Sequence, residues 1–228
     1  MMYKHLSAKM FLFSAKQPHD FVFRLNLLIL FYKNLKMHIP LARPLVLASN
    51  SPRRHQLLAQ CGFRFSTEVR PTDEVFPTAM PPQEVPAYLA RKKAEEFQSD
   101  TQDNLILCAD TIVVKGDRIL NKPADEKAAV AMLELLSGAT HRVVTGICLL
   151  DKDKFITRTD VAAVSFRKFT TQELEFYVKY QPPFDKAGGY GIQDWIGLTG
   201  IERIEGSYYT IMGLPTHLVY EMLRPYFV

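Results

Sequence analysis

One stretch decides how this chain begins its fold: Leu45-Val-Leu-Ala-Ser-Asn-Ser-Pro-Arg-Arg-His-Gln-Leu-Leu58. Residues 45–48 form a short apolar run of the kind that makes a buried strand. Ser51 is a preferred helix N-cap residue, and Pro52 suits the first helical position. The stretch therefore predicts a strand that leads directly into a helix, which indicates an α/β protein.

The junction between this strand and helix predicts an anion-binding site. The first N–H groups of a helix have no backbone partner and lie at the positive end of the helix dipole. Further donors stand beside them, namely Ser49, Ser51, Arg53 and Arg54. An ordinary cap with surface arginines would explain a single serine and arginine. Two serines, a proline and paired arginines within six residues favour a phosphate site instead.

The composition indicates a globular protein with one sizeable core, because its 228 residues are 47% hydrophobic. The three cysteines, Cys61, Cys108 and Cys148, lie far apart and lack the close pairs of metal and redox motifs. We expect buried free thiols in a reducing compartment. His141 also has no second His or Cys at metal-ligand spacing, so we interpret it as structural.

The charge is unevenly distributed along the chain. The formal net charge is +4, from 28 basic and 24 acidic residues. The first 36 residues hold six of the basic and one of the acidic residues, so the remaining 22 basic and 23 acidic residues nearly cancel. A nearly neutral body with a local cationic site favours a phosphorylated small molecule, whereas nucleic-acid binding requires a basic face. We therefore expect no nucleic-acid partner.

Residues 1–36 form a distinct N-terminal segment. Its apolar run, residues 21–32, is 12 residues long and is interrupted by Arg24 and Asn26, whereas a bilayer span needs about 20 apolar residues. Because no small-residue cleavage site follows, we predict neither a membrane span nor a secretory signal. We interpret residues 1–36 as an extension that is disordered or a mis-assigned start, and residues 37–228 as a single domain.

Two acidic residues are candidates for chemistry at phosphorus. Asp110 follows a buried strand predicted at residues 105–109, and ligands of open α/β sheets gather where strands end. Glu74 lies in the polar loop of residues 70–77, where an acidic side chain is usually just solvated. Together the two carboxylates could hold a divalent cation, a water molecule or both.

Two lysines could reach the same place. Lys122 follows a hairpin predicted over residues 112–120, whose return would bring it towards Asp110. Lys93 falls on the apolar stripe of a helix predicted over residues 83–97, where snorkelling of the stem to water is the usual explanation. With the paired arginines, these lysines could neutralise a triphosphate.

The segment 181–193 predicts a long loop rich in proline and glycine. Gly188, Gly189 and Gly191 would let the backbone approach a ligand or take a positive φ. Gln193 offers both a donor and an acceptor, which suits the edge of a nucleotide base.

The motif Leu47-Ala-Ser-Asn-Ser-Pro-Arg-Arg resembles the signature of the Maf family of nucleoside triphosphate pyrophosphatases, Ser-x-Ser-Pro-Arg-Arg after an apolar strand. Further blocks resemble that family in the same order along the chain: Ala109-Asp-Thr, Asn121-Lys-Pro, Ser137-Gly, His141-x-Val-x-Thr-Gly146, Lys186-Ala-Gly-Gly-Tyr-Gly-Ile-Gln193, and Gly206-Ser-Tyr followed by Gly213-Leu-Pro. The series runs from Leu45 to the C-terminus. One departure is Thr210, where the family usually has asparagine.

The resemblance implies an α/β fold of the Maf/inosine-triphosphatase-like kind, an elongated mixed sheet with two lobes flanking a central cleft. It implies cleavage of nucleoside triphosphates between the α and β phosphates to the monophosphate and pyrophosphate, with a divalent metal cation (Mg²⁺ or Mn²⁺) as cofactor. It also implies a cytoplasmic enzyme, and a homodimer is one oligomeric state that the resemblance allows.

The resemblance also implies roles for single residues. Asp110 matches the proton acceptor, and an acid is found in the family at a place matching Glu74. Arg53, Thr111 and Gln193 match the specificity residues of the branch that acts on dTTP and UTP, whereas the 7-methylguanosine triphosphate branch tends to have Trp and Glu at the first and last of these. The residues expected to bind phosphate are Ser49, Ser51, Arg54, Lys93 and Lys122.

Two alternative functions stay open. One is a pyrophosphatase for methylated or other non-standard purine nucleotides, which a nucleotide panel assayed for pyrophosphate release would separate. The other is a non-catalytic, nucleotide-sensing regulator of septum formation. An Asp110→Asn variant tests this second alternative, because a catalyst should lose turnover while it retains nucleotide binding.

Overall fold

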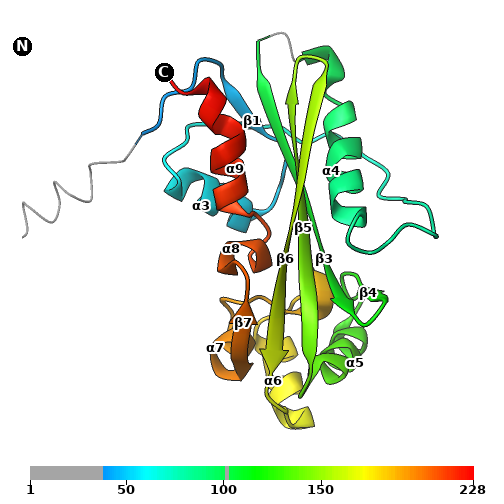
Figure 1. The fold of residues 1–228 in the computed structure, drawn as a ribbon. Helices are drawn as coiled ribbons and strands as arrows, with labels where there is room; N and C mark the ends of the chain where they lie inside the picture. Colours follow the sequence, from blue (N-terminus) through cyan, green and yellow to red (C-terminus); the bar gives the residue numbers. More distant parts are fainter. Residues whose placement is uncertain (1–37, 101–102) are drawn as a thin grey trace, which may run out of the picture. The chain divides into compact units, whose positions relative to one another are not determined.

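In the computed structural model, which describes residues 38–100 and 103–228, a seven-stranded mixed sheet runs through the unit Ile39–Val228 (Figure 1). The strands are β1 (Leu45–Leu47), β2 (Ser66–Thr67), β3 (Leu105–Lys115), β4 (Arg118–Leu120), β5 (Thr140–Asp151), β6 (Lys154–Phe166) and β7 (Ile201–Glu205). Their order is β2-β1-β3-β5-β6-β7, with β4 paired to β3. β1 is parallel to β2 and β3, and the other pairs are antiparallel. The predicted α/β class is confirmed, while the interpretation of residues 1–36 concerns a segment outside the described residues.

Helices connect and cover these strands. They are α3 (Pro52–Gln60), α4 (Val85–Glu95), α5 (Glu126–Leu136), α6 (Thr171–Tyr180), α7 (Trp195–Gly200), α8 (Tyr208–Ile211) and α9 (Thr216–Leu223), with 3₁₀ turns η1 (Gln98–Asp100), η2 (Ala187–Gly189) and η3 (Arg224–Tyr226). Figure 1 shows α3 and α9 on one side of the long strands and α4 on the other. The start of α3 at Pro52 is as predicted, although the Ser51 side chain makes no capping hydrogen bond.

The long strand β3 differs from the prediction. The apolar run was expected to end at Ala109, but the strand continues through Asp110, which is paired with Gly146 in the middle of β5. Residues 111–114 are β-branched and continue the ladder. The strand that does end here is β1, since Leu47 lies opposite Leu107 and the chain then turns into α3. Asp110 therefore lies just beyond the carboxyl end of β1, inside its neighbour.

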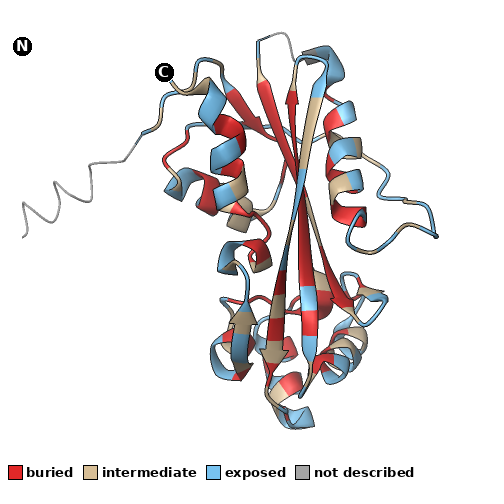
Figure 2. Ribbon diagram, in the orientation of Figure 1, coloured by how far each residue is buried: buried red, intermediate tan, exposed pale blue. Residues whose placement is uncertain are grey.

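Side chains of the long strands alternate between two faces of the sheet. Figure 2 shows long buried stretches on these strands. On the α4 face, β3 and β5 contribute Ile106, Cys108, Val144 and Cys148 to the packing against this helix. The opposite face carries two separate hydrophobic clusters. The α3/α9 cluster includes Leu47, Leu58, Leu107, Ile147, Leu149 and Val219. The α5/α6 cluster includes Val113, Leu133, Val143, Val164, Phe166 and Tyr177.

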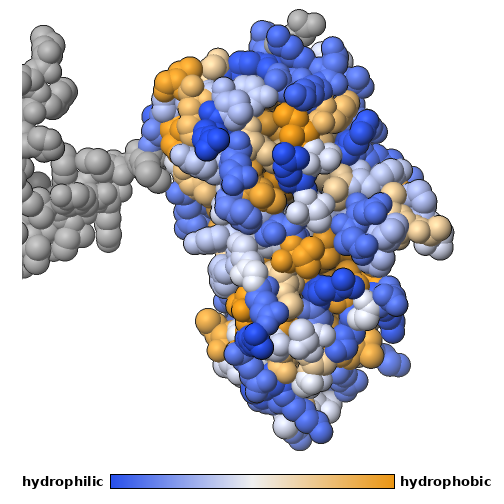
Figure 3. All heavy atoms as spheres, viewed as in Figure 1, coloured by the Kyte–Doolittle hydropathy of each residue, from blue (hydrophilic) through white to orange (hydrophobic). Residues whose placement is uncertain are grey.

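The surface and the thiols agree in part with the sequence analysis. Cys61, Cys108 and Cys148 are all free, as predicted, but only the last two are buried. On the face seen in Figure 3, small hydrophobic groups are interspersed with hydrophilic ones. Within residues 38–100 and 103–228, each helix is too short or too polar to cross a membrane.

Candidate active site

A cavity of about 430 Å³ lies beside the carboxyl end of β1. It is lined by the start of α3, the loop before α4, α4 itself, β3, and the segments around η2 and after α8. All ten site residues predicted from the sequence contribute to its lining: Ser49, Ser51, Arg53, Arg54, Glu74, Lys93, Asp110, Thr111, Lys122 and Gln193. The fold thus brings residues from distant parts of the sequence to one place.

Lys93 joins the two predicted carboxylates. Its Nζ donates to Asp110 Oδ1 over 2.6 Å and lies 2.7 Å from Glu74 Oε1. The hydrogen bond from Lys93 holds the pKa of Glu74 below its ordinary value, and Lys122 acts in the same direction. The lysine on the apolar stripe of α4 therefore points to the cavity and is paired there, rather than reaching outward to bulk water.

Gly146 explains how α4 comes close enough for this pairing. This residue lies opposite Asp110 on β5, and a Cβ at its position would lie 2.1 Å from the backbone nitrogen of Ala87. The first turn of α4 therefore packs directly on the strand backbone, which only glycine permits. Lys93, two turns further along the helix, lies within reach of Asp110 as a result.

Arg54 lies on the other side of β3 and has neutral partners. Its Nε donates to Gly213 O over 2.8 Å, Nη1 to Ala109 O over 2.9 Å and Nη2 to Thr111 Oγ1 over 3.0 Å. Burial lowers the pKa of this guanidinium, and the nearby charge of Asp110 is the largest influence that opposes the shift. Arg54 therefore supplies a fixed positive charge in the cavity wall.

Arg53 belongs to a chain of charges on the η2 side of the cavity. Its Nη1 lies 3.2 Å from Asp185 Oδ2, while Lys186 Nζ lies 2.8 Å from Asp185 Oδ1 and 3.7 Å from Asp194 Oδ2. Asp185 and Lys186 both line the cavity but were given no role in the sequence analysis. The sequence did contain a signal for Lys186, since this residue is the first of the glycine-containing block 186–193 that resembles the family.

The other predicted residues occupy different depths. Ser49 is buried, and its Oγ accepts from the Ser51 N–H over 3.2 Å. Lys122 and Gln193 are exposed at the cavity, where they are open to a ligand.

The glycines of the η2 region agree in part with the prediction of positive φ angles. Gly188 and Gly189 have positive φ, of 73° and 71°, whereas no positive φ is found at Gly191.

Comparison with known proteins gives the family of this chain. Residues 44–226 match the Maf-like protein family. The chain belongs to the Maf family. Three relatives are each named dTTP/UTP pyrophosphatase. That of Parabacteroides distasonis is 44% identical over 182 residues, covering 79% of this chain and 94% of the relative. That of Porphyromonas gingivalis is 43% identical over 186 residues, with 80% and 94% covered. That of Christiangramia forsetii is 43% identical over 181 residues, with 79% and 92% covered.

Proteins of the Maf family generally use a divalent metal, so the donors of this cavity can be tested for one. Among the described residues, no group of three or more His, Cys, Asp and Glu side chains could hold a metal ion by itself. Asp110 and Glu74 nevertheless supply carboxylate oxygens on both sides of the Lys93 ammonium. Mg²⁺ is commonly bound by one or two carboxylates together with substrate phosphates and water. The donor set fits such an ion when a nucleotide supplies the remaining ligands.

His141 of this Maf protein lies behind the cavity. It is buried, and its Nε2 shares a hydrogen bond of 2.7 Å with the hydroxyl of Tyr190, which lines the cavity. Burial lowers the pKa of His141 to about 3, so the ring is neutral at neutral pH. This placement agrees with a structural residue that supports Tyr190.

Proposed function

We propose that this Maf protein hydrolyses dTTP and UTP to the monophosphate and pyrophosphate. The observation that carries the proposal is the meeting of the Asp110 carboxylate with several cationic side chains around one cavity. The relatives named for this activity support it, because each aligns over more than nine-tenths of its own length.

The reaction needs a triphosphate held in place and a water molecule that loses a proton. Arg53, Lys122 and Lys186 bind the phosphate oxygens and offset their charge, while Arg54 adds its positive charge from the cavity wall. Water attacks the α phosphorus, its proton passes to Asp110, and the bond from the α phosphorus to the bridging oxygen breaks. Pyrophosphate leaves with the electron pair of that bond.

Asp110 and Glu74 are the residues that would hold a divalent cation, Mg²⁺ or Mn²⁺. Such an ion, when bound, offsets charge on the phosphate oxygens. In its absence, Lys93 keeps the two carboxylates together and prevents their mutual repulsion. Its ammonium also contributes positive charge where the phosphates lie.

Base selection is assigned to the exposed end of the cavity. Gln193 presents an uncharged amide that can pair with the O4 and N3–H edge of uracil or thymine. Arg53 and Thr111 complete the specificity set implied by the family; Thr111 lines the cavity and also accepts a hydrogen bond from Arg54.

The finer architecture and the setting of the enzyme belong to the same proposal. The α3/α9 and α5/α6 clusters support two lobes within a single domain of residues 37–228, with the cavity as the cleft between them. A homodimer and a cytoplasmic location stay predictions from the family resemblance.

A nucleotide panel tests the proposed function. Purified protein is incubated with dTTP, UTP, 7-methylguanosine triphosphate and deaminated purine triphosphates, with and without Mg²⁺ or Mn²⁺, and pyrophosphate release is measured. We expect the fastest turnover with dTTP and UTP, and only with metal. Faster turnover of a purine nucleotide would favour the methylated or non-standard purine pyrophosphatase. Binding of dTTP without any cleavage would favour the nucleotide-sensing regulator of septum formation.

A further inference from the structure

A row of polar side chains crosses the sheet between its two hydrophobic clusters. Thr111 of β3 lies directly opposite Thr145 of β5, which lies opposite Asp160 of β6. Thr145 is fully buried. A buried hydroxyl costs free energy unless it is hydrogen-bonded, so a polar row at this level needs its own partners.

The partners of the row fix the direction of each hydrogen bond. A guanidinium only donates, so Thr111 Oγ1 accepts from Arg54 over 3.0 Å. A carbonyl only accepts, so the single hydroxyl hydrogen of Thr145 is donated to Thr210 O over 2.8 Å. In the 3.0 Å contact between the two hydroxyls, Thr111 must therefore be the donor.

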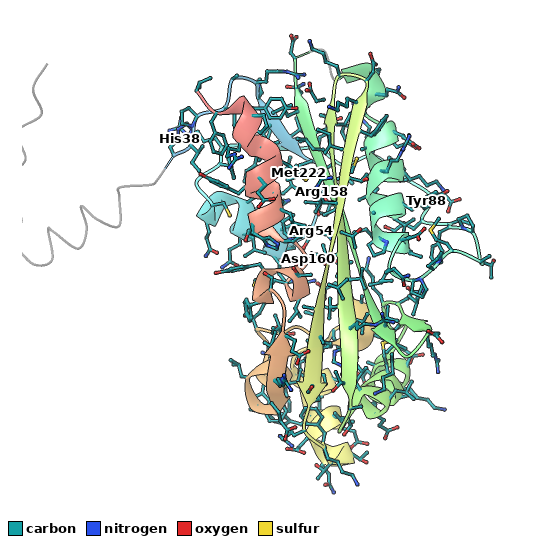
Figure 4. All side chains as sticks on the ribbon, in the orientation of Figure 1. His38, Arg54, Tyr88, Arg158, Asp160 and Met222 are labelled. Carbon is teal, nitrogen blue, oxygen red and sulfur yellow. The ribbon has the colours of Figure 1, made fainter. Side chains whose placement is uncertain are left out.

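Thr210 carries the row to a negative charge. Its hydroxyl donates to the Asp160 carboxylate, whose Oδ2 also lies 3.9 Å from His217 Nε2. Figure 4 shows Arg54 and Asp160 at the same level of the long strands, next to α8. The row thus links the partly buried Arg54 to a carboxylate on β6 through three threonines.

We propose that Thr145 is a positioning residue for Arg54, acting through Thr111, in the nucleotide-binding cavity of this enzyme. The proposal rests on the proposed function. The single hydroxyl hydrogen of Thr111 is donated to Thr145, so none is left for a nucleotide base. It influences the substrate by holding the guanidinium, and Thr145 holds Thr111 in the orientation that accepts from Arg54.

A substitution series at Thr145 tests this role. Thr145→Val keeps the shape but removes the hydroxyl that accepts from Thr111, whereas Thr145→Ser keeps this hydroxyl. Because the charge of Arg54 acts on bound substrate and transition state alike, we expect Thr145→Val to raise KM for dTTP about tenfold, with kcat changed less than about threefold. Thr145→Ser should return KM to within about twofold of the wild type. Thr159→Val, on the exposed part of β6, is the matched control and should leave both constants unchanged.

A double-mutant cycle separates positioning from a general loss of packing. In an Arg54→Lys background, Thr145→Val should change KM less than about twofold, because the guanidinium that Thr145 positions through Thr111 is already absent. A further tenfold rise in that background would overturn the proposal, and so would an unchanged KM in the single variant. If Thr145→Val does not fold, Asp160→Ala at the far end carries the test. It should raise KM about threefold, and no change would overturn the proposal. A wild type that cleaves neither dTTP nor UTP would instead remove the proposed function.

Discussion

The cations on the two sides of β3 have different hydrogen-bond partners. Neighbouring residues of a strand point to opposite faces, so Asp110 faces α4 while Thr111 faces α3 and α8. On the α4 side, the Lys93 ammonium lies between two carboxylates, at 2.6 and 2.7 Å. On the other side, the Arg54 guanidinium donates to carbonyl and hydroxyl oxygens that carry no charge.

This difference gives each side of the strand its own charge. Two carboxylates around one ammonium leave an excess of negative charge, which attracts a cation. An arginine among neutral acceptors leaves an excess of positive charge, which attracts an anion. A nucleoside triphosphate bound with a divalent metal needs both, and two consecutive residues of β3, Asp110 and Thr111, contact the two cations.

The largest expected effect comes from the α4 side. Asp110→Asn keeps the size of the side chain but removes the proton acceptor, so kcat for dTTP should fall about 1000-fold. Nucleotide binding, measured by calorimetry without turnover, should change less than about fivefold. If the variant kept a tenth or more of wild-type kcat, Asp110 would not be the proton acceptor.

Arg54→Lys tests the other side. A lysine keeps the charge but cannot supply the planar fork, so several of the acceptors around Arg54 lose their donor. We expect urea unfolding to show a loss of about 2–3 kcal/mol in the free energy of unfolding. Arg203→Lys, at an exposed position on β7, is the control and should change stability by less than about 0.5 kcal/mol. Equal stability of both variants would show that the neutral acceptors do not depend on the fork.

Local sequence signals were sufficient for the ends of several helices. Thr170 and Glu173 form a capping box at the start of α6, and Asp125 accepts from the Ala128 N–H at the start of α5, so each cap is made by residues only three apart in the sequence. The end of β3 was predicted wrongly, because a charged residue interrupted the apolar run. Pairing with β5 determines how far that strand extends. Because β5 lies further along the chain, this pairing cannot be read from the local sequence pattern.

The candidate site shows the same division. Single residues could be selected from their chemistry and from the family blocks, and all ten line one cavity. Their partners could not be predicted, since Arg54 is bonded to a carbonyl 159 residues away. The pairing of Asp185 with Arg53 was missed for the same reason, because the sequence separates them by 132 residues.

Acid should lower the stability of the protein by protonating Glu74 on the α4 side. Its pKa is lower in the folded protein than the ordinary 4.5, so the unfolded chain binds the proton more readily and stability falls as pH drops below that value. Above pH 5 we expect Glu74→Gln to lower the Tm by about 1–2 °C, as for a largely exposed ion pair. The difference from the wild type should disappear as pH falls through the lowered pKa. Glu84→Gln, exposed before α4, is the control, and a difference that persists at low pH would mean that charge is not its cause.

Arg53 offers the smallest test, because it combines features of both sides. It stands next to Arg54 in α3, yet its partner is the carboxylate of Asp185, which also holds Lys186. In the proposed function the triphosphate binds both cations, so it competes with this carboxylate for them. Asp185→Asn removes the competing charge and should lower KM for dTTP about threefold, the effect expected of one exposed ion pair. Asp117→Asn, in the turn between β3 and β4, is the matched control. A rise in KM would instead show that Asp185 holds the two cations in place for the substrate. The carboxylate would then orient Arg53, just as the neutral acceptors orient Arg54.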